Sequence, residues 1–446
     1  MSTPKIIDAV TGILVHDDEI YMIRRHAGLP SFPGYQAFPG GKVDAADAGD
    51  VPDLSVFHGH DGRLLRALLR EIREEIGIDL EVDRPLAVDL LGRALAPEGP
   101  PTRFDTRFFR IRLSRRPEFT LDPREIHSGE WASARAWLER YHSGDLLLAP
   151  PTRIALDILA EDIAAAAINF EQRIEANPLF MIESVRGVRQ FFVRSHTLPP
   201  AQFTNCFLIG DDDAHRILVD PSPKSDELAE ALIAAAATLG VHEVFLTHHH
   251  IDHRERAEVI ARRLGVGIAM SADTQARITA RQPGVFDGLA VRNYGDGDPV
   301  TRWLGRSVRT YAVPGHDEGQ LALMPDGHAW CIVGDLIQGV GTVVIPSPEG
   351  NMRKYFASLE RVIAWNPRVV IPSHGVAQGG LFFIEQTLQH RRQREAQVLT
   401  LHRAGKTADE MLPEIYPALD PPLLPLAKMN IDSHIAKLRE EGLIAA

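Results

Sequence analysis

The sequence predicts a multidomain protein of the α/β and α+β classes that ends in a small helical appendage. Its 446 residues exceed the roughly 250–300 residues beyond which a single hydrophobic core stops growing. Strand-like and helix-like apolar spacings occur together through most of the chain, which is typical of sheets layered with helices. The last part is helical throughout. We therefore expect three domains, at residues 1–175, 180–385 and 386–446.

The composition excludes several classes of protein. Hydrophobic residues make up 44% and charged residues 24%, as in folded globular proteins. The net charge of −12 argues against a general polyanion binder, although a local basic groove would be compatible with it. The two cysteines, Cys206 and Cys331, exclude a disulfide framework and favour a reducing compartment. With no secretory signal and no apolar stretch of roughly 18 residues, we expect a cytoplasmic protein without a membrane partner.

The elements of the first domain follow from local patterns. Residues 6–15 and 20–25 read as strands joined by a turn, and a Gly/Pro-rich loop follows at 28–41. Residues 64–76 carry apolar side chains at helical spacing. Further elements are expected as a strand at 103–113 and helices at 131–140 and 152–167.

The second and third domains are predicted in the same way. Strands are expected at 203–209, 216–219, 244–247, 307–313, 320–324, 330–333 and 369–372. Helices are expected between them at 226–239, 254–264 and 354–365. The appendage should contain helices at 386–401, 407–415 and 429–441.

Three glutamates lie at the end of the helix predicted at 64–76. Glu71, Glu74 and Glu75 are related by helical spacings of three and four residues, so their carboxylates share a face. Like charges at this spacing repel, but a hard divalent cation such as Mg²⁺ or Mn²⁺ would make the arrangement favourable. For the three glutamates alone, a solvated acidic face is the alternative.

The segment Arg70-Glu71-Ile72-Arg73-Glu74-Glu75-Ile76-Gly77, preceded by Phe38-Pro39-Gly40-Gly41, resembles the Nudix box, over residues 5–170. The resemblance implies an α/β/α sandwich that cleaves a diphosphate with metal-activated water. It assigns Glu71, Glu74 and Glu75 to Mg²⁺ or Mn²⁺, with Glu74 and Glu75 also catalytic. It adds the Gly40 carbonyl as a ligand and gives Arg70 the task of orienting Glu71.

The Nudix resemblance has three departures. Asp47 stands where the box has a glutamate, and about fifteen extra residues precede Arg70. Residues 34–41 look like the branch that cleaves coenzyme A, yet Pro30 stands where that branch has an arginine. The domain could therefore bind its nucleotide without cleaving it. Glu125 and Glu130 are candidates for a catalytic base, with ordinary surface positions as the alternative.

A second cluster, Thr247-His248-His249-His250-Ile251-Asp252-His253, contains His-x-His-x-Asp-His. On an extended stretch His248 and His250 point to one side, and the next turn carries Asp252 and His253. Imidazole and carboxylate groups at this density suit Zn²⁺, or Mn²⁺ and Fe. Three more candidates each follow an apolar strand-like run and can reach the same sheet edge: His316, Asp335 and His374.

This set resembles the metallo-β-lactamase family over residues 180–385, which implies an αββα sandwich and two metal ions that share a hydroxide. The family pattern assigns His248, His250 and His316 to one ion, and Asp252, His253 and His374 to the other. Asp335 bridges both ions, Asp252 also accepts a proton, and Asp220 binds the ligands rather than the ions. The pattern leaves His249 without a role.

These residues do not determine which class of bond the enzyme cleaves. Three features together look like the β-lactamase-like protein 2 group, which implies cleavage of single-stranded RNA. They are the segment Thr204-Asn205-Cys206-Phe207-Leu208, the His-Asp run and the appendage, which resembles a winged helix. The same core resembles glyoxalase II, which implies thioester hydrolysis. A basic neighbourhood in the appendage could contact phosphate or simply be solvated: Arg391, Arg392, Arg394, Arg403 and Lys406.

Our main hypothesis is a metal-dependent hydrolase for an ester, a thioester or a phosphodiester. It is fused to a Nudix domain for a small-molecule diphosphate such as coenzyme A. The alternative is a single-stranded RNA endoribonuclease in which the Nudix domain is a non-catalytic, nucleotide-binding regulatory module. A homo-oligomer is compatible with either hypothesis.

Overall fold

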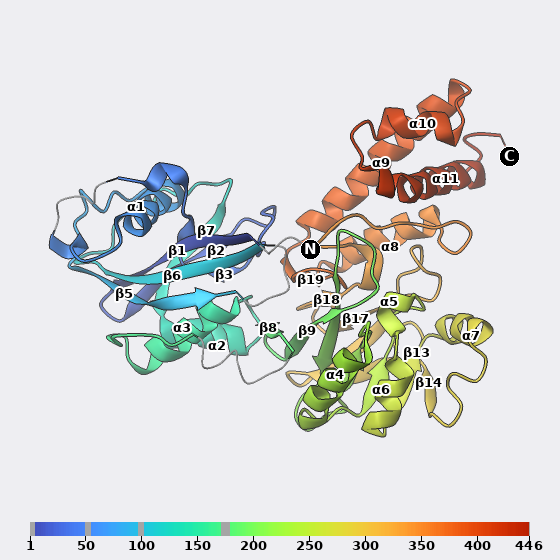
Figure 1. Ribbon diagram of the computed structural model, residues 1–446, viewed down its shortest axis with the longest axis horizontal. Coiled ribbons are helices and arrows are strands. Elements are labelled where there is room, and N and C mark those ends of the chain that lie inside the picture. The colour runs from blue at the N-terminus through green and yellow to red at the C-terminus, as the bar shows by residue number, and fades with distance from the viewer. Residues whose placement is uncertain (1–4, 50–54, 97–101, 171–178, 446) are drawn as a thin grey trace. The chain divides into compact units, whose positions relative to one another are not determined.

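The computed structural model describes residues 5–49, 55–96, 102–170 and 179–445 (Figure 1). The chain divides into two compact units, Met1–Arg186 and Gly187–Ala446. Both units combine sheets with helices, which confirms the predicted fold class. No helix among these described residues has the length and apolar character needed to cross a bilayer. Both cysteines are buried and unbridged.

The first unit contains one mixed sheet. Its strands are β1 (Lys5–His16), β2 (Glu19–Arg25), β3 (Gln36–Ala37), β4 (Gly40–Lys42), β5 (Ala87–Leu95), β6 (Thr102–Arg112) and β7 (Ile126–Ser133). The central order is β3-β2-β1-β6-β5, with β4 paired to β1 and β7 paired to β2. Strands β1 and β6 run parallel along their whole length. The unit ends with the strand β8 (Met181–Val185).

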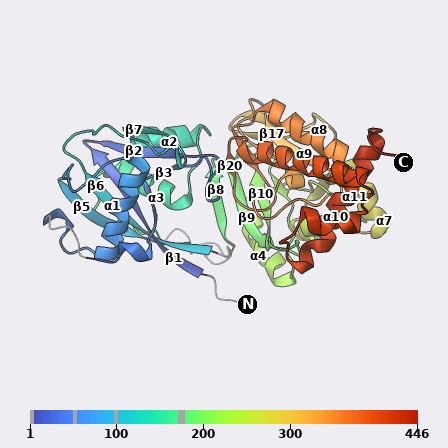
Figure 2. The same cartoon turned by 90° about the horizontal axis from the view of Figure 1, so that it is seen from above.

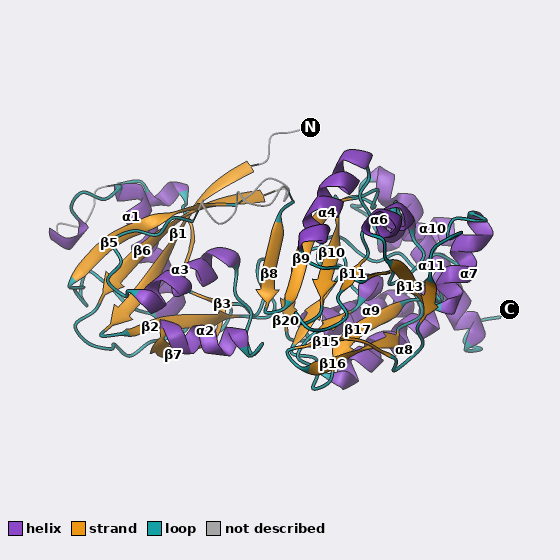
Figure 3. Ribbon diagram, turned by 90° about the horizontal axis from the view of Figure 1, so that it is seen from below, coloured by secondary structure: helices purple, strands orange, loops and turns teal. Residues whose placement is uncertain are grey.

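Helices cover both faces of this sheet, as Figure 3 shows. Helix α1 (Gly62–Ile76) lies on one face, and α2 (Ala134–His142) and α3 (Pro150–Glu161) lie on the other. Along β1, Val10 and Leu14 belong to the α1 core while Ile13 and Val15 belong to the α2–α3 core. This division follows from the alternation of side chains along a strand, and the result is the predicted α/β/α sandwich.

Two predicted helices of this unit have different bounds. Residues 131–133 belong to strand β7, because Ser133 caps α2 by accepting the Ala136 amide at 3.1 Å. Helix α3 stops at Glu161 rather than 167. The Asp162 carboxylate accepts the Ala164 amide at 2.9 Å, and this local turn competes with the helix. Two short 3₁₀ helices, Ala45–Asp47 and Ser55–Phe57, precede α1.

The second unit contains two stacked sheets. The first runs in the order β14-β13-β12-β11-β10-β9. These strands are β9 (Val188–Arg194), β10 (Phe203–Ile209), β11 (Ile217–Val219), β12 (Glu243–Phe245), β13 (Gly267–Met270) and β14 (Val291–Asn293). The second sheet runs from β15 to β20 in chain order. Its strands are β15 (Pro299–Trp303), β16 (Arg306–Ala312), β17 (Leu321–Pro325), β18 (Cys331–Ile332), β19 (Val369–Ile371) and β20 (Gln378–Gly379).

Helices lie outside both sheets, which gives the predicted αββα arrangement. On the first sheet these are α4 (Asp226–Thr238), α5 (Ile251–Arg254), α6 (Ala257–Leu264) and α7 (Ala272–Arg281). The 3₁₀ turn Gly334–Leu336 and α8 (Met352–Trp365) belong to the second sheet. The core on that side joins α8 to the start of α9 through apolar residues such as Leu359 and Leu388. Figure 2 shows α8 and α9 side by side.

The chain ends in a helical bundle of α9 (Phe382–Arg403), α10 (Ala408–Ile415) and α11 (Leu424–Glu440). A short 3₁₀ turn, Pro421–Leu423, precedes α11. Val398, Met411, Ile431 and Leu438 form its core. The predicted helices are present, with α9 and α11 starting earlier than expected. The division of the chain at residues 1–175, 180–385 and 386–446 stays a prediction.

The helix predicted at 254–264 is wrong as a single element. It is split into α5 and α6, because Arg256 adopts the left-handed conformation with φ 63°. Between the two helices the Glu255 amide donates to the Ser222 hydroxyl at 3.1 Å. The expected helix N-terminus at His253 is therefore a four-residue turn rather than the start of a long helix.

Candidate metal centre

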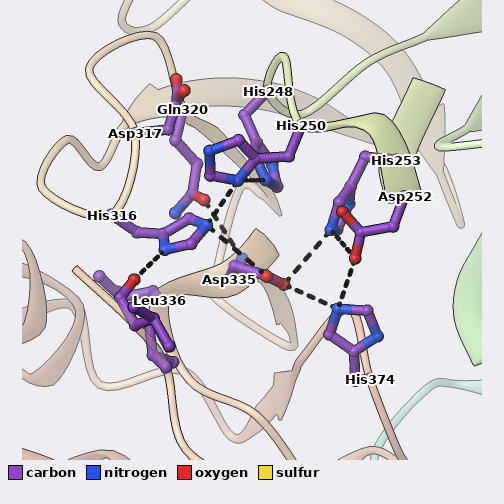
Figure 4. Close-up of polar contacts among 12 residues, drawn as sticks. His248, His250, Asp252, His253, His316, Asp317, Gln320, Asp335, Leu336 and His374 are labelled. Atoms are coloured by element: carbon purple, nitrogen blue, oxygen red, sulfur yellow. Dashed lines mark hydrogen bonds and ion pairs between the residues drawn. The ribbon is translucent and has the colours of Figure 1, made fainter. Parts of the chain in front are cut away.

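Loops at one edge of the two stacked sheets bring the predicted side chains of the second unit together (Figure 4). The Thr247–His253 segment follows β12, His316 follows β16, Asp335 follows β18 and His374 follows β19. Parallel or neighbouring strands that end at one edge deliver the residues after them to the same place. Residues more than a hundred positions apart thus face a common centre.

His248, His250 and His316 form the first group. Nδ1 of His250 lies 3.1 Å from Nε2 of His248 and 2.9 Å from Nε2 of His316. The three candidate ligand atoms all lie within 4.8 Å of one another. A set of three imidazole nitrogens that face one point is the donor set that zinc sites use.

Asp252, His253 and His374 form the second group. Oδ2 of Asp252 lies 3.8 Å from Nε2 of His253 and 3.7 Å from Nε2 of His374. The histidines are fully buried, and the carboxylate is largely so. This set of two nitrogens and one oxygen also suits a divalent cation.

Asp335 lies between the two groups. Its Oδ2 is 3.7 Å from Nε2 of His316, in the first group. Its Oδ1 is 3.6 Å from Nε2 of His253 and 3.4 Å from Nε2 of His374, in the second. One carboxylate thus offers a separate oxygen to each group, which is the geometry that a bridging ligand needs.

Contacts on the far side of each ring fix its orientation. Nδ1 of His316 donates to the carbonyl of Val344 at 2.8 Å, and Nδ1 of His374 donates to the carbonyl of Phe203 at 2.8 Å. Nδ1 of His248 lies 3.0 Å from the Thr247 hydroxyl oxygen. Because Nδ1 of these three rings has a partner, Nε2 is the ring nitrogen that faces the centre, as in metal-bound histidines.

Asp220 supports this arrangement from a fully buried position. Its Oδ2 accepts the Thr247 hydroxyl at 2.6 Å and Nδ1 of His253 at 2.9 Å. Its Oδ1 accepts the Thr247 amide at 2.8 Å. Asp220 therefore contacts a candidate ligand and the backbone that carries the others, which matches the place that the family pattern assigns to it.

The centre contains buried polar atoms that have no hydrogen-bond partner among the described residues: Nε2 of His253, Nε2 of His374 and Oδ1 of Asp335. Leaving such a group unsatisfied costs about 1–3 kcal/mol. A cation bound at this point would satisfy all three. The donor set and these orphaned atoms therefore fit a metal site.

Electrostatics differ between the two groups. Burial, together with the neighbouring charges of His253 and His250, lowers the pKa of His248 well below its usual value. Burial also disfavours the charged form of His253, but the carboxylates of Asp335 and Asp252 outweigh it and raise the pKa of this histidine. For Asp335 burial acts against ionisation, and the neighbouring His374 and His253 nevertheless hold its pKa well below the usual range. Asp335 is therefore ionised at neutral pH and can act as an anionic ligand.

Two residues of this site had no assigned role in the sequence analysis. Oε1 of Gln320 accepts the Asp335 amide at 3.2 Å and so holds the turn that presents Asp335. The side-chain amide of Asn205 donates to the carbonyls of Pro372 and Gly375, at 2.8 and 2.7 Å, on either side of His374. Neither residue type is a metal ligand by itself, so no spacing rule points to them.

His249 lies outside the two groups. It is fully buried, and its Nδ1 is hydrogen-bonded to the carboxylate of Asp317. Its Nε2 lies 3.8 Å from Oε2 of Glu349. His249, His250 and Glu349 also form a group of possible ligand atoms.

In the first unit, α1 presents the three glutamates beside a network around Arg70. The guanidinium donates to Glu71 Oε1 at 2.9 Å and to Glu74 Oε2 at 3.1 Å. Two further bonds, at 2.9 and 3.0 Å, reach the two oxygens of the buried Asp47. Asp47 is thus a bidentate partner of Arg70 in spite of the extra residues between them, because the inserted segment leaves α1 intact.

Glu75 is the buried member of the glutamate set. Its Oε2 accepts the Gly40 amide at 2.8 Å, and burial raises its pKa to about 8. A Cβ on Gly41 would lie 2.5 Å from the carboxylate of Glu71, so this glycine makes room for that side chain. Three carboxylates are the right donors for Mg²⁺ or Mn²⁺. Among the described residues they do not form a group with all ligand atoms within 4.8 Å.

The two candidate bases differ. Glu130 is held in a bidentate ion pair with Arg140, at 2.7 and 2.8 Å, and this bond lowers its pKa. Glu125 lies close enough to Glu71 and Glu75 that its charge helps to raise their pKa values. Of the two, Glu125 is the one near the glutamate set.

The basic neighbourhood of the appendage is largely engaged within the chain. Arg391 is buried and hydrogen-bonded to the carbonyl of Val343. Arg392 pairs with Glu360 at 2.6 Å, and Lys406 pairs with Glu414. Arg394 lies over the ring of Tyr416 at 4.8 Å. These four side chains hold helices in place, which is the structural alternative to a phosphate-binding surface.

Three family models match separate parts of the chain. Residues 6–146 match the NUDIX domain, residues 199–374 match the metallo-beta-lactamase superfamily, and residues 407–446 match the beta-lactamase associated winged helix domain.

Three curated relatives resemble parts of the chain. A beta-lactamase-like protein 2 homolog from Drosophila melanogaster is 28% identical over 54% of this chain and 84% of its own length. An atrochrysone carboxyl ACP thioesterase from Claviceps purpurea is 26% identical over 48% of this chain and 67% of its own length. A hydroxyacylglutathione hydrolase from Brucella anthropi is 33% identical over 27% of this chain and 42% of its own length. The protein is therefore an enzyme that joins a Nudix hydrolase domain, a metallo-beta-lactamase hydrolase domain and a C-terminal winged helix.

Proposed function

We propose that the metallo-beta-lactamase domain hydrolyses a thioester at a centre of two metal ions. His248, His250 and His316 would hold one ion, and Asp252, His253 and His374 the other, with Asp335 between them. Zn²⁺ is the first candidate for both positions, with Mn²⁺ and Fe as alternatives. The supporting observation is the set of buried Nε2 and carboxylate oxygen atoms that face one another without a partner.

The two ions would supply an ionised water and polarise the scissile carbonyl. The residues of the chain provide the rest. Asp220, Val344 and Phe203 hold the rings of His253, His316 and His374 so that the site needs no rearrangement. Asp252 keeps a small exposed fraction, 16%, and is placed to accept a proton. Water is consumed, and the products are a carboxylic acid and a thiol.

A thioester is favoured over an RNA phosphodiester for two reasons. One relative is a thioesterase and another is a hydroxyacylglutathione hydrolase. The basic side chains around α9, which would be needed for a polyanion, are mostly bound to groups of the same chain. An endoribonuclease with a regulatory Nudix domain is the outcome that the test below would reveal instead.

We propose that the Nudix domain acts on a nucleoside diphosphate derivative such as coenzyme A. Glu71, Glu74 and Glu75 would bind Mg²⁺ or Mn²⁺, with Gly40 beside them and Arg70 orienting Glu71. The contacts of Arg70 with Glu71 and Glu74 support this assignment. Coenzyme A would connect the two domains chemically, because acyl-coenzyme A is a thioester and a diphosphate. A cytoplasmic location and a homo-oligomer stay predictions.

The proposal for the metallo-beta-lactamase domain is tested by metal analysis and turnover together. The purified chain should contain about two metal ions in this centre and release thiol from acyl-coenzyme A. His248→Ala should abolish the release, whereas His142→Ala, at an exposed histidine of the first unit, should not. Unchanged thiol release by His248→Ala would refute the proposal. A cut of single-stranded RNA that depends on His248, without thiol release, would favour the endoribonuclease.

The Nudix proposal has its own test. Coenzyme A is incubated with the chain and Mg²⁺, and adenosine 3′,5′-bisphosphate is measured as the product of diphosphate cleavage. Glu74→Gln should remove this activity and leave thiol release intact. If the wild-type chain binds coenzyme A without cleaving it, the domain is a binding module and the catalytic assignment of Glu74 and Glu75 is wrong.

A further inference from the structure

A short segment, Val343-Val344-Ile345, runs between the candidate metal centre and the C-terminal helices. We refer to it as the strap. It has no regular secondary structure, yet Val343 is 2% exposed and Ile345 is fully buried. A buried loop must satisfy its backbone polar groups within the protein, so the partners of the strap show what it connects.

On one side the strap holds a candidate metal ligand. The carbonyl of Val344 accepts Nδ1 of His316 at 2.8 Å, which leaves Nε2 of that ring facing the centre. A little further along the same loop, the Asn351 amide donates to the carbonyl of Gly315 at 2.8 Å. The loop therefore fixes both the ring of His316 and the backbone that carries it.

On the other side three side chains from the C-terminal helices hold the strap. Oδ1 of Asn430 accepts the Ile345 amide at 2.9 Å, and the Ser433 hydroxyl donates to the Ile345 carbonyl. Both residues belong to α11. Arg391, on α9, donates to the Val343 carbonyl. All three side chains are buried, at 2–5% exposure, so their contacts are shielded from water and strong.

The two helices are themselves fixed to each other and to α8. Lys437 on α11 donates to Glu395 on α9 at 2.7 Å. Near the end of α11, Glu440 accepts Asn351 at 3.0 Å and Arg353 at 3.1 Å. Figures 1 and 2 both show α11 beside α9. The strap is thus attached to a rigid support rather than to a mobile tail.

The same support reaches a second candidate ligand. The guanidinium of Arg391 lies over the ring of Tyr355 at 5.6 Å. The Tyr355 hydroxyl donates to the carbonyl of Leu336 at 2.7 Å, and Leu336 follows Asp335 directly. The C-terminal helices therefore reach His316 through the strap and the loop of Asp335 through Tyr355 of α8.

We infer that the C-terminal helices α9 and α11 are a structural part of the metal centre, in which Asn430, Ser433 and Arg391 are positioning residues for His316. They act through the strap, because none of them contacts the centre itself. The inference rests on the proposed function, since it takes His316 as a metal ligand. Partners behind a ligand typically contribute 10–100-fold to metal affinity, and we expect about tenfold for these more remote contacts.

The test compares four variants of the full chain. Ser433→Ala removes the donor to Ile345, and Ser433→Thr keeps it. Asn430→Ala removes the acceptor. Lys428→Gln, on the same helix, breaks the exposed ion pair with Asp409 without a contact to the strap and serves as the matched control. The readout is release of Zn²⁺ to a chelator, followed as two separate steps, with the melting temperature recorded for each variant.

His316→Ala identifies the release step that belongs to the first metal group. Ser433→Ala and Asn430→Ala should lower the Zn²⁺ affinity measured in that step by about tenfold. The affinity measured in the other step should stay unchanged. Ser433→Thr should restore wild-type affinity, and Lys428→Gln should leave both release steps unchanged.

The inference is overturned if Ser433→Ala lowers the Zn²⁺ affinity of both steps equally, because that result indicates a general loss of stability. It is also overturned if the affinity of neither step changes. If the wild-type chain binds no Zn²⁺ at all, the proposed function itself fails, and the inference fails with it.

Discussion

Nδ1 of His253 lies 2.9 Å from Oδ2 of Asp220, in a pair that is fully buried. The same oxygen also accepts the Thr247 hydroxyl at 2.6 Å. Asp220 is therefore an acceptor for two donors at once. It engages Nδ1 of His253 as a donor and so leaves Nε2 of that ring facing the candidate metal centre.

Replacing Asp220 with asparagine should weaken metal binding at the second group. The amide has the same shape, but one of its two ends is a donor, so either His253 or Thr247 loses its acceptor. We expect Zn²⁺ affinity at the group of Asp252, His253 and His374 to fall by about 10–100-fold. Chelator competition measures the change. Asp226→Asn, an exposed carboxylate on α4, is the control, and equal affinities in both variants would contradict the role of Asp220.

Asp47 and Arg70 should be energetically coupled. Asp47 is buried, and both of its oxygens accept from Arg70. Hydrogen bonds between charged groups contribute about 1.5–3 kcal/mol, and because Arg70 is partly exposed we expect a coupling of about 1–2 kcal/mol. A double-mutant cycle with Asp47→Ala and Arg70→Ala measures it, with hydrogen exchange of α1 as the local readout of stability. Additive effects would show that the pair is not coupled.

Gly41→Ala should separate stability from metal binding in the Nudix domain. The added Cβ would lie 2.5 Å from the Glu71 carboxylate. That carboxylate is the end of a flexible side chain, so it can move away at little cost in stability. Its displacement should nevertheless reduce Mn²⁺ binding to the glutamate set. Electron paramagnetic resonance of free Mn²⁺ gives the affinity, and thiol release by the other domain is the internal control. Unchanged Mn²⁺ affinity would argue against Glu71 as a ligand.

The candidate ligands were predictable because metal-binding side chains are recognisable types that follow apolar strand-like runs. His316, Asp335 and His374 could be placed beside His248 on that basis. The residues that orient them could not. Gln320 and Asn205 act through backbone carbonyls and amides, and Val344 uses its own carbonyl, so residue identity carries no signal. The strap is specified by contacts from Asn430 and Ser433, which lie more than eighty residues away.

Helix bounds show the same limit. The break between α5 and α6 follows from the left-handed conformation of Arg256. No glycine or proline stands at this break to predict it from the sequence. The bond from the Glu255 amide to Ser222 spans the turn. Tertiary contacts therefore overrode a helical pattern that was correct for α6 alone.

Glu75 should make the stability of the metal-free first unit depend on pH. Burial raises its pKa to about 8 in the folded state, against 4.5 for a glutamate side chain in water. The folded state thus favours the protonated form, and the stability that this provides is complete below about pH 4.5 and lost as the pH rises through about 8.

In a chelator, Glu75→Gln should match the wild type in melting temperature near pH 5 and exceed it increasingly toward pH 8. Glu74→Gln, at an exposed position of the same turn, should show no such trend. Added Mg²⁺ should reverse the order at pH 8, because a bound cation favours the ionised carboxylate. A difference between wild type and Glu75→Gln that stays constant from pH 5 to pH 8 would show that Glu75 does not titrate in this range.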